Sequence, residues 1–95
     1  MLITIHPHAK TRMAQRGICL DQIKKVVTYG RKKHIRKAAV FFLGTKELRY
    51  FRIMDPDLEL ALRDSKNIHV VIEDSCVKTV YRNANPNLKE HAWYG

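Results

Sequence analysis

Three side chains near the start of the chain are of the types that handle a phosphate and a proton. His8, Arg12 and Arg16 follow one another at intervals of four residues, which places them along one side of an α-helix. Arginine is a permanently charged donor that matches phosphate geometry, and imidazole gains and loses a proton near neutral pH. This row therefore suits a phosphodiester substrate.

A second set of polar side chains lies near the end of the chain. Thr79 and Tyr81 alternate along a strand-like segment, so both face one side of a sheet. Cleaving RNA without a metal needs a base for the 2′-hydroxyl, a cation for the charged phosphorane and an acid for the leaving 5′-oxygen. The residues that could share these tasks are His8, Arg12, Arg16, Thr79 and Tyr81. Each also has a purely structural interpretation: a helix-start histidine, arginines lying over a sheet edge, and good β formers.

The charge balance points to a polyanion as partner. Among 95 residues, 18 Lys and Arg stand against 9 Asp and Glu, which gives a formal net charge of +9. A basic protein of this kind binds nucleic acid with an affinity that falls steeply with salt. The candidate RNA or ribosome footprint consists of Arg31, Lys32, Lys33, Arg36 and Lys37, with Arg82 in addition. The alternative for the run from residue 31 to 37 is a solvated loop and strand start.

Several classes of protein are not indicated. The apolar run at residues 1–5 is too short for a signal peptide or a membrane span, and we expect a cytoplasmic protein that does not contact membranes. Cys19 and Cys76 form no CxxC pair, and we expect two buried thiols in a reducing compartment. The histidines show no metal-ligand spacing, so we expect neither a metal nor another cofactor.

The patterns predict a single domain that begins with two helices. A short strand over residues 2–5 precedes a helix from Pro7 to Arg16, which Gly17 ends. A second helix begins after Cys19, with Gln22 in the capping-box position, and ends at Gly30.

The remainder predicts mainly strands. Residues 35–43 and 48–53 are expected to pair as a hairpin, and Asp55-Pro56-Asp57 could open a short helix. Residues 68–72 and 77–82 are expected to form a second hairpin. The tail from about residue 84 has little pattern, and its Trp93 and Tyr94 could anchor it or dock a partner. The predicted fold class is α+β, two N-terminal helices packed on an antiparallel sheet of about four to five strands.

The two motif blocks together resemble a family. The run from His8 to Ile18 with Ile23, Val26 and Gly30, and the later Val70-Val71-Ile72 leading into residues 79–83, resemble the bacterial family called domain of unknown function 4258. The resemblance implies the RelE-like and barnase-like ribonuclease superfold, toxin-type metal-independent RNA cleavage, possibly on the ribosome, and an acidic antitoxin partner. The matching positions are His8, Arg12, Arg16, Thr79 and Tyr81, with Arg82. The family usually caps its first helix with Ser or Thr, whereas His6 and Pro7 stand here.

Two other functions compete with the ribonuclease. Met13, Gly17, Ile23 and Val26 approach the spacing of a helix-turn-helix unit, whose second helix would offer Asp21, Gln22, Lys24 and Lys25 to the DNA major groove. The other is a catalytically inactive domain of the same fold whose basic surface binds nucleic acid or an acidic protein. The sequence does not indicate an oligomeric state.

Overall fold

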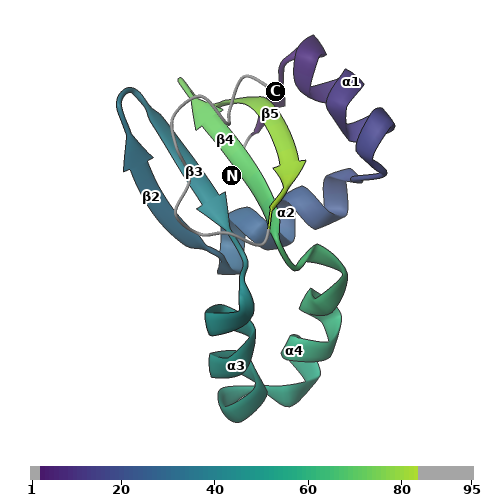
Figure 1. The fold of residues 1–95 in the computed structure, drawn as a ribbon, viewed down its shortest axis with the longest axis vertical. Coiled ribbons are helices and arrows are strands. Elements are labelled where there is room, and N and C mark those ends of the chain that lie inside the picture. The colour runs from purple at the N-terminus through teal and green to yellow at the C-terminus, as the bar shows by residue number, and fades with distance from the viewer. Residues whose placement is uncertain (1–2, 84–95) are drawn as a thin grey trace.

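A five-stranded sheet with strand order β1-β5-β4-β3-β2 organises the computed structural model, which describes residues 3–83 (Figure 1). The predicted α+β class is confirmed. β1 pairs with β5 in parallel, whereas the other neighbours are antiparallel, so the sheet is mixed. Trp93 and Tyr94 lie outside the described residues. The strands are β1 (Thr4–Ile5), β2 (Arg31–Ile35), β3 (Ala38–Phe42), β4 (Ile68–Glu73) and β5 (Cys76–Arg82).

The two N-terminal helices begin and end where the sequence predicts. α1 (Pro7–Arg16) opens with the His6 side chain, whose Nδ1 accepts a hydrogen bond from the His8 backbone N–H at 3.1 Å. An imidazole thus takes the place of the usual Ser or Thr cap. Gly17 ends α1 with φ at 62°, a left-handed conformation that suits glycine. α2 (Leu20–Tyr29) follows, and the Cys19 N–H donates to Oε1 of Gln22 at 2.9 Å.

The main core lies between these helices and one face of the sheet. α1 supplies Ala9, and α2 supplies an apolar stripe with the 3.6-residue period of an amphipathic helix. These side chains pack on residues of β4 and β5 that face the helices. The buried members are Ala9, Ile18, Ile23, Val26, Val27, Leu43, Leu48, Leu62, Ile68, Val70, Val77 and Val80.

The predicted pairing of residues 35–43 with residues 48–53 is wrong. Residues 48–53 lie in α3 (Thr45–Met54), which precedes α4 (Pro56–Leu62) and a short turn η1 (Arg63–Ser65). Leu48 and Phe51, three residues apart, both face the core, and Glu47 accepts from the Gly44 N–H at 2.9 Å at the helix start. Helical spacing and a cap outweigh the strand-like composition. The short helix expected after Asp55 is confirmed as α4.

The true partner of β3 is β2, the basic run itself. β2 pairs with β3 along its whole length, and Arg36, at φ 55°, makes the tight turn between them. β2 is an edge strand, and positive charge along an exposed edge discourages pairing with other chains. In the run from residue 31 to 37, residues 31–35 therefore form a full strand, and the turn at residues 36 and 37 divides the strand predicted over residues 35–43.

The second predicted hairpin, β4 with β5, is confirmed and contains an irregularity. Val71 pairs with Thr79 and Ile72 with Val77, which leaves Lys78 as an extra residue on β5. Such a bulge shifts the alternation of side chains by one position. Val77 and Val80 consequently both face the helices, while Thr79 and Tyr81 face the opposite side of the sheet.

Candidate nucleic-acid interface

A cavity of about 390 Å³ opens where the end of α1 meets the end of β5. Arg16, Tyr81 and Arg82 line it, so two of the predicted catalytic side chains and one predicted RNA-binding side chain meet there. A volume of this size falls within the range of small-molecule and nucleotide sites. The first helix and the last strand thus converge on one cationic pocket.

The unpaired edge of β5 explains why these arginines gather. On the side of β5 away from β4, β1 covers only Cys76 and Val77. The rest of this edge has no neighbouring strand among the described residues, and the end of α1 lies there instead. Nη1 of Arg16 donates to the Val80 carbonyl at 2.6 Å, and Nη1 of Arg82 donates to the carbonyl of Arg16. A guanidinium bound to a neutral carbonyl keeps its full positive charge.

An aromatic row crosses the sheet on the face opposite the helices. Arg31 pairs with Phe42, Phe42 with His69, and His69 with Tyr81 in consecutive strands. The rings of Phe42 and His69 stack with centroids 4.3 Å apart, and those of His69 and Tyr81 stack at 4.9 Å with an interplanar angle of 6°. The guanidinium of Arg31 lies 5.4 Å from the centroid of the Phe42 ring. The row ends at the cavity.

Three polar atoms on this face are buried without a hydrogen-bond partner: Nε2 of His69, Oγ1 of Thr79 and the hydroxyl of Tyr81. These residues are 0%, 4% and 8% exposed. Unpaired buried polar groups are rare in folded proteins because each forfeits its hydrogen bonds to water. The three atoms lie on neighbouring positions of β4 and β5.

The two ionisable members of the row are both held neutral at ordinary pH. Burial lowers the pKa of His69 from 6.5 to about 4, although the contact of its Nδ1 with the Asn67 carbonyl at 3.2 Å opposes the shift. Since a carbonyl only accepts, Nδ1 carries the hydrogen and Nε2 is the acceptor. Burial raises the pKa of Tyr81 to about 12. Tyr81 therefore remains a hydrogen-bond donor.

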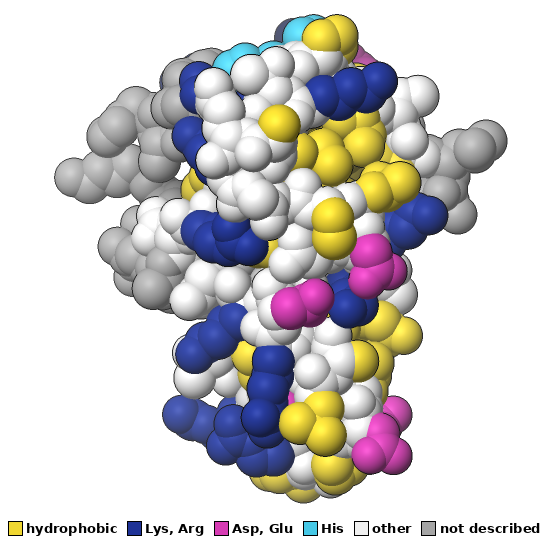
Figure 2. Space-filling model, turned by 90° about the vertical axis from the view of Figure 1, so that its right-hand side faces the viewer, with side chains coloured by type: hydrophobic (Ala, Val, Ile, Leu, Met, Phe, Trp, Pro, Cys, Tyr) yellow, Lys and Arg dark blue, Asp and Glu magenta, His cyan; other side chains and the backbone are white. Residues whose placement is uncertain are grey.

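His8 and Arg12 lie elsewhere along α1. His8 is exposed at its beginning, eight residues before Arg16, which corresponds to about 12 Å along the helix axis. Histidine side chains gather at the top of the face in Figure 2, the end at which α1 begins. Arg12 is half-buried, and its Nη1 donates to Oε1 of Gln15 at 2.9 Å. The structure thus brings Arg16, but not His8, to the cavity.

The predicted footprint from Arg31 to Lys37 is divided between two faces of the sheet. Arg31 and Lys33 alternate onto the face of the aromatic row, and Arg31 also forms an ion pair with Glu47 at 3.6 Å. Lys32 faces the other side, with its Nζ 5.8 Å from the Phe41 ring centroid. Arg36 and Lys37 are exposed at the turn that follows β2. Only Arg31 and Lys33 extend the cationic surface toward the row.

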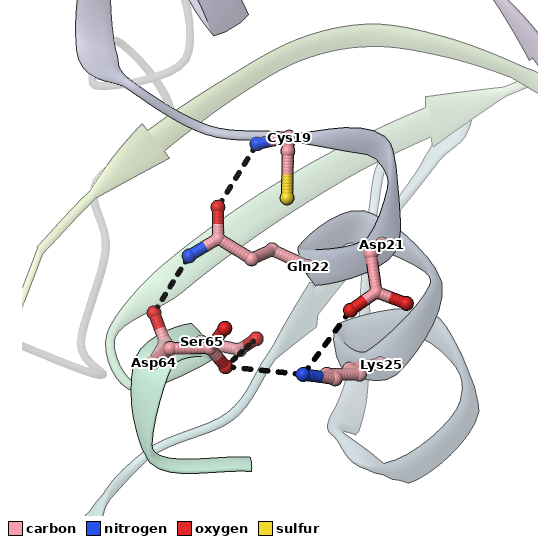
Figure 3. Close-up of polar contacts among 6 residues, drawn as sticks. All are labelled: Cys19, Asp21, Gln22, Lys25, Asp64 and Ser65. Carbon is pink, nitrogen blue, oxygen red and sulfur yellow. Dashed lines mark hydrogen bonds and ion pairs between the residues drawn. The ribbon is translucent and has the colours of Figure 1, made fainter. Parts of the chain in front are cut away.

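The contacts of α2 argue against the helix-turn-helix alternative (Figure 3). Gln22 is buried, and its Nε2 donates to the Asp64 carbonyl at 2.9 Å. Lys25 forms ion pairs with Asp21 at 3.2 Å and with Asp64 at 3.4 Å, and the Asp21 hydrogen bond is the main cause that raises its pKa. Two of the four side chains that would read DNA bases, Gln22 and Lys25, are thus bound to Asp64 of η1.

The cysteine expectation is corrected in part. Cys19 is exposed at the start of α2, and Cys76 is half-buried. Within residues 3–83 no group of three or more His, Cys, Asp or Glu side chains is arranged to hold a metal ion. No helix among these residues is long and apolar enough to cross a membrane.

Comparison with known proteins assigns a family. A model described as "Domain of unknown function (DUF4258)" matches residues 5–82. The chain belongs to the DUF4258 family. No curated protein and no solved structure matches it significantly. The match spans all the residues of α1 and of β5, so the cavity and the aromatic row belong to the part of the chain that defines DUF4258.

Sequence reasoning missed the middle of the row. Phe42 and His69 were not among the candidate residues, yet they connect Arg31 to Tyr81. The available signal was His69 in the apolar run of residues 68–72. The alternation of side chains along a strand places it on the other face of the sheet from Ile68 and Val70. A polar ring in a central strand requires partners on its own face of the sheet.

Proposed function

We propose that this DUF4258 chain binds single-stranded RNA and cleaves it without a metal at the cavity lined by Arg16, Tyr81 and Arg82. The observation that carries the proposal is the meeting of two guanidinium groups at a single concave site with Tyr81, whose buried hydroxyl has no hydrogen-bond partner. Forked cations are suited to phosphate, and the net charge of +9 attracts a polyanion. Figure 2 shows dark blue Lys and Arg side chains distributed over the face that includes α1.

The chemistry is an internal displacement at phosphorus. The 2′-oxygen forms a bond to phosphorus while the bond to the 5′-oxygen breaks, which leaves a 2′,3′-cyclic phosphate and a free 5′-hydroxyl. Arg16 and Arg82 stabilise the charge that develops on the phosphorane, and the Tyr81 hydroxyl gives its proton to the leaving oxygen. The 2′-hydroxyl loses its proton to hydroxide from solvent, and Tyr81 is reprotonated by water.

His8 has a separate task in this proposal. Since it lies about 12 Å from Arg16 along α1, it contacts the same strand at another nucleotide. The basic β2 strand, through Arg31 and Lys33, binds the backbone on the other side of the row. An acidic antitoxin that neutralises this surface remains part of the proposal, since it suits the charge of the chain.

The test is RNA cleavage in the presence of EDTA. We expect the wild type to release products with 2′,3′-cyclic phosphate ends, and Tyr81→Phe or Arg82→Ala to cut about 100-fold or more slowly. Arg49→Ala, which removes an exposed arginine from α3, is the matched control and should cut like the wild type. His8→Ala should retain most of the rate. Intact RNA, or unchanged cleavage by Tyr81→Phe and Arg82→Ala, would overturn the assignment.

A further inference from the structure

β2 forms the edge of the sheet farthest from β5 (Figure 1). It pairs with β3 on one side, and no strand of the described residues lies on its other side. The first four of its five residues, Arg31 to His34, are exposed. An exposed edge strand carries backbone N–H and C=O groups that can pair with another chain.

The turn at the end of β2 determines which of its backbone groups point outward. Two residues join Ile35 to Ala38, and these two are paired across the hairpin. In such a hairpin the pair beside the turn exchanges both of its hydrogen bonds, and bonded and non-bonded pairs then alternate along the strands. Alternate residues of β2 therefore bond to β3, whereas the N–H and C=O groups of Lys32 and His34 point away from it. An added strand would meet these groups.

The side chains of β2 place positive charge on both faces of this edge. Lys33 faces the aromatic row, and Lys32 faces the helix side, where its Nζ lies 5.8 Å from the Phe41 ring centroid. Arg31 shares the face of Lys33 but also forms an ion pair with Glu47 at 3.6 Å. A second copy of β2 would bring like charges together across the strands, which is destabilising. A strand that carries carboxylates would instead be attracted on both faces.

We propose that an extended acidic segment of a partner protein pairs with β2 and adds a strand to the five-stranded sheet. This inference rests on the proposed function, which includes an acidic partner, and names the surface that the partner binds. Because the cations lie on both faces of the edge, the segment carries carboxylates at neighbouring positions rather than at every second one. The backbone ladder supplies affinity, and the carboxylates supply selectivity.

An RNA strand would use the same cations in another way. Phosphate oxygens accept hydrogen bonds from Lys32 and Lys33, but they donate none to the outward C=O groups of Lys32 and His34. RNA bound through Arg31 and Lys33 and an acidic strand on β2 would need the same side chains, so they exclude each other. The cavity lies at the opposite edge of the sheet. The partner therefore weakens RNA binding without contacting the residues proposed to cleave it.

The first test uses a fluorescein-labelled peptide that repeats Glu-Glu-Thr, so that carboxylates project from both sides of the extended chain. One control peptide carries Gln in place of each Glu. In the other, the backbone amides are N-methylated, which removes the ladder donors and keeps the charge. We expect both controls to bind the full chain about 10-fold or more weakly than the parent peptide, by fluorescence anisotropy. No binding of the parent, or equal binding of either control, would overturn the proposal.

The second test changes the edge itself. His34→Pro removes one outward N–H and keeps the bonds to β3, because an edge strand tolerates proline where its missing N–H would face solvent. We expect this variant to bind the peptide about 2- to 10-fold more weakly and to bind RNA like the wild type. His34→Ala keeps the N–H and is the matched control, which should bind both like the wild type. Equal peptide binding by His34→Pro and His34→Ala would contradict the ladder.

Amide hydrogen exchange covers the case in which His34→Pro does not fold, as judged by circular dichroism. In the wild type, the peptide should slow exchange at Lys32 and His34, whereas Lys33, already bonded to β3, should change little. Unchanged exchange at Lys32 and His34 would overturn the proposal. Protection by single-stranded RNA but not by the peptide would also overturn it and would assign the edge to nucleic acid. Protection by the peptide without any cleavage of RNA would leave the strand site standing and reject the ribonuclease.

Discussion

At the scale of single residues, His69 shows how the fold holds a chemically capable group neutral. Its ring is fully buried between Phe42 and Tyr81, and its Nδ1 is bound to the Asn67 carbonyl. The charged form has no water and no described carboxylate to stabilise it, which is why burial lowers the pKa to about 4. At neutral pH His69 is therefore an uncharged aromatic ring that stacks on Tyr81.

Because the pKa of His69 is lowered, the free energy of unfolding depends on pH. In the unfolded chain the imidazole takes up a proton near pH 6.5, whereas the folded protein resists protonation until about pH 4. The contribution of His69 is therefore fully present above pH 6.5 and is lost as the pH falls toward 4. Urea unfolding at pH 7.5 and pH 4.5 should show a larger loss for the wild type than for His69→Phe, by up to about 2 kcal/mol. Equal losses in both proteins would show that His69 is accessible to protons.

Among carboxylates, Glu59 also has a lowered pKa, but for the opposite reason: its charged form is stabilised, whereas that of His69 is destabilised. It is 1% exposed at the junction of α4 with α3, and its oxygens accept from Nε of Arg63 at 2.7 Å and from Nε of Arg52 at 3.4 Å. The hydrogen bond from Arg63 is the main cause that lowers its pKa. Its contribution is lost as the pH falls below the ordinary range of a carboxyl group. The wild type and His69→Phe both contain Glu59, so the difference between their losses of stability reports on His69 alone.

At the scale of elements, the cavity depends on how helices and strands meet. α1 lies along β5 because β1 is too short to cover that edge, and the Val80 carbonyl accepts a hydrogen bond from Arg16. The start of β2 is set by a different constraint. Gly30 passes so close to its neighbours that a Cβ atom would lie 2.4 Å from the Val26 oxygen and 2.8 Å from the Phe42 oxygen. This contact holds Arg31 beside Phe42.

Two glycine substitutions compare the close backbone contact at Gly30 with the positive φ at Gly17. Gly30→Ala forces backbone atoms apart and should lower the free energy of unfolding by about 3 kcal/mol. Gly17→Ala meets no atom within 4 Å and suffers only from its positive φ, so the cost should be about 1 kcal/mol. Chemical denaturation of both variants measures the two losses. Equal losses would show that the backbone near Gly30 can yield.

The sequence predicted those elements whose ends carry local signals. Pro7, Gly17 and Gly30 mark helix boundaries through their own backbone conformation, which does not depend on tertiary packing. Both N-terminal helices were therefore placed correctly. Residues 48–53 were misassigned because aromatic and β-branched residues suit a strand when packing is ignored. The site followed the same rule. Arg16, Tyr81 and Arg82 could be named from local patterns, whereas the row through Phe42 and His69 depends on strand order, which no local pattern encodes.

At the scale of the whole molecule, charge and topology act together. The net charge of +9 would attract RNA to many surfaces, but the fold distributes its cations unequally. Arg31, Arg16 and Arg82 lie at the two ends of one aromatic row, although Arg31 is also paired with Glu47. Lys32 contacts Phe41 on the other face, and Lys25 is paired with Asp21 and Asp64. A diffuse charge brings a polyanion close, and a focused set of contacts holds it in register.

Salt dependence can separate the diffuse charge from the focused contacts. For single strands, the slope of log affinity against log salt is about −0.7 for each phosphate that the protein neutralises. Arg82→Ala should make this slope less steep by about 0.7 to 1, because a defined phosphate contact is lost. Arg49→Ala removes the same unit of charge from an exposed site on α3 and should leave the slope nearly unchanged. The measurement is fluorescence anisotropy between about 50 and 300 mM KCl. The probe is a fluorescently labelled single-stranded RNA in which every ribose is 2′-O-methylated, so that it binds but cannot be cut. If both variants lowered the slope equally, net charge alone would explain the binding, and the cavity would lose its role as the place where the phosphate is held.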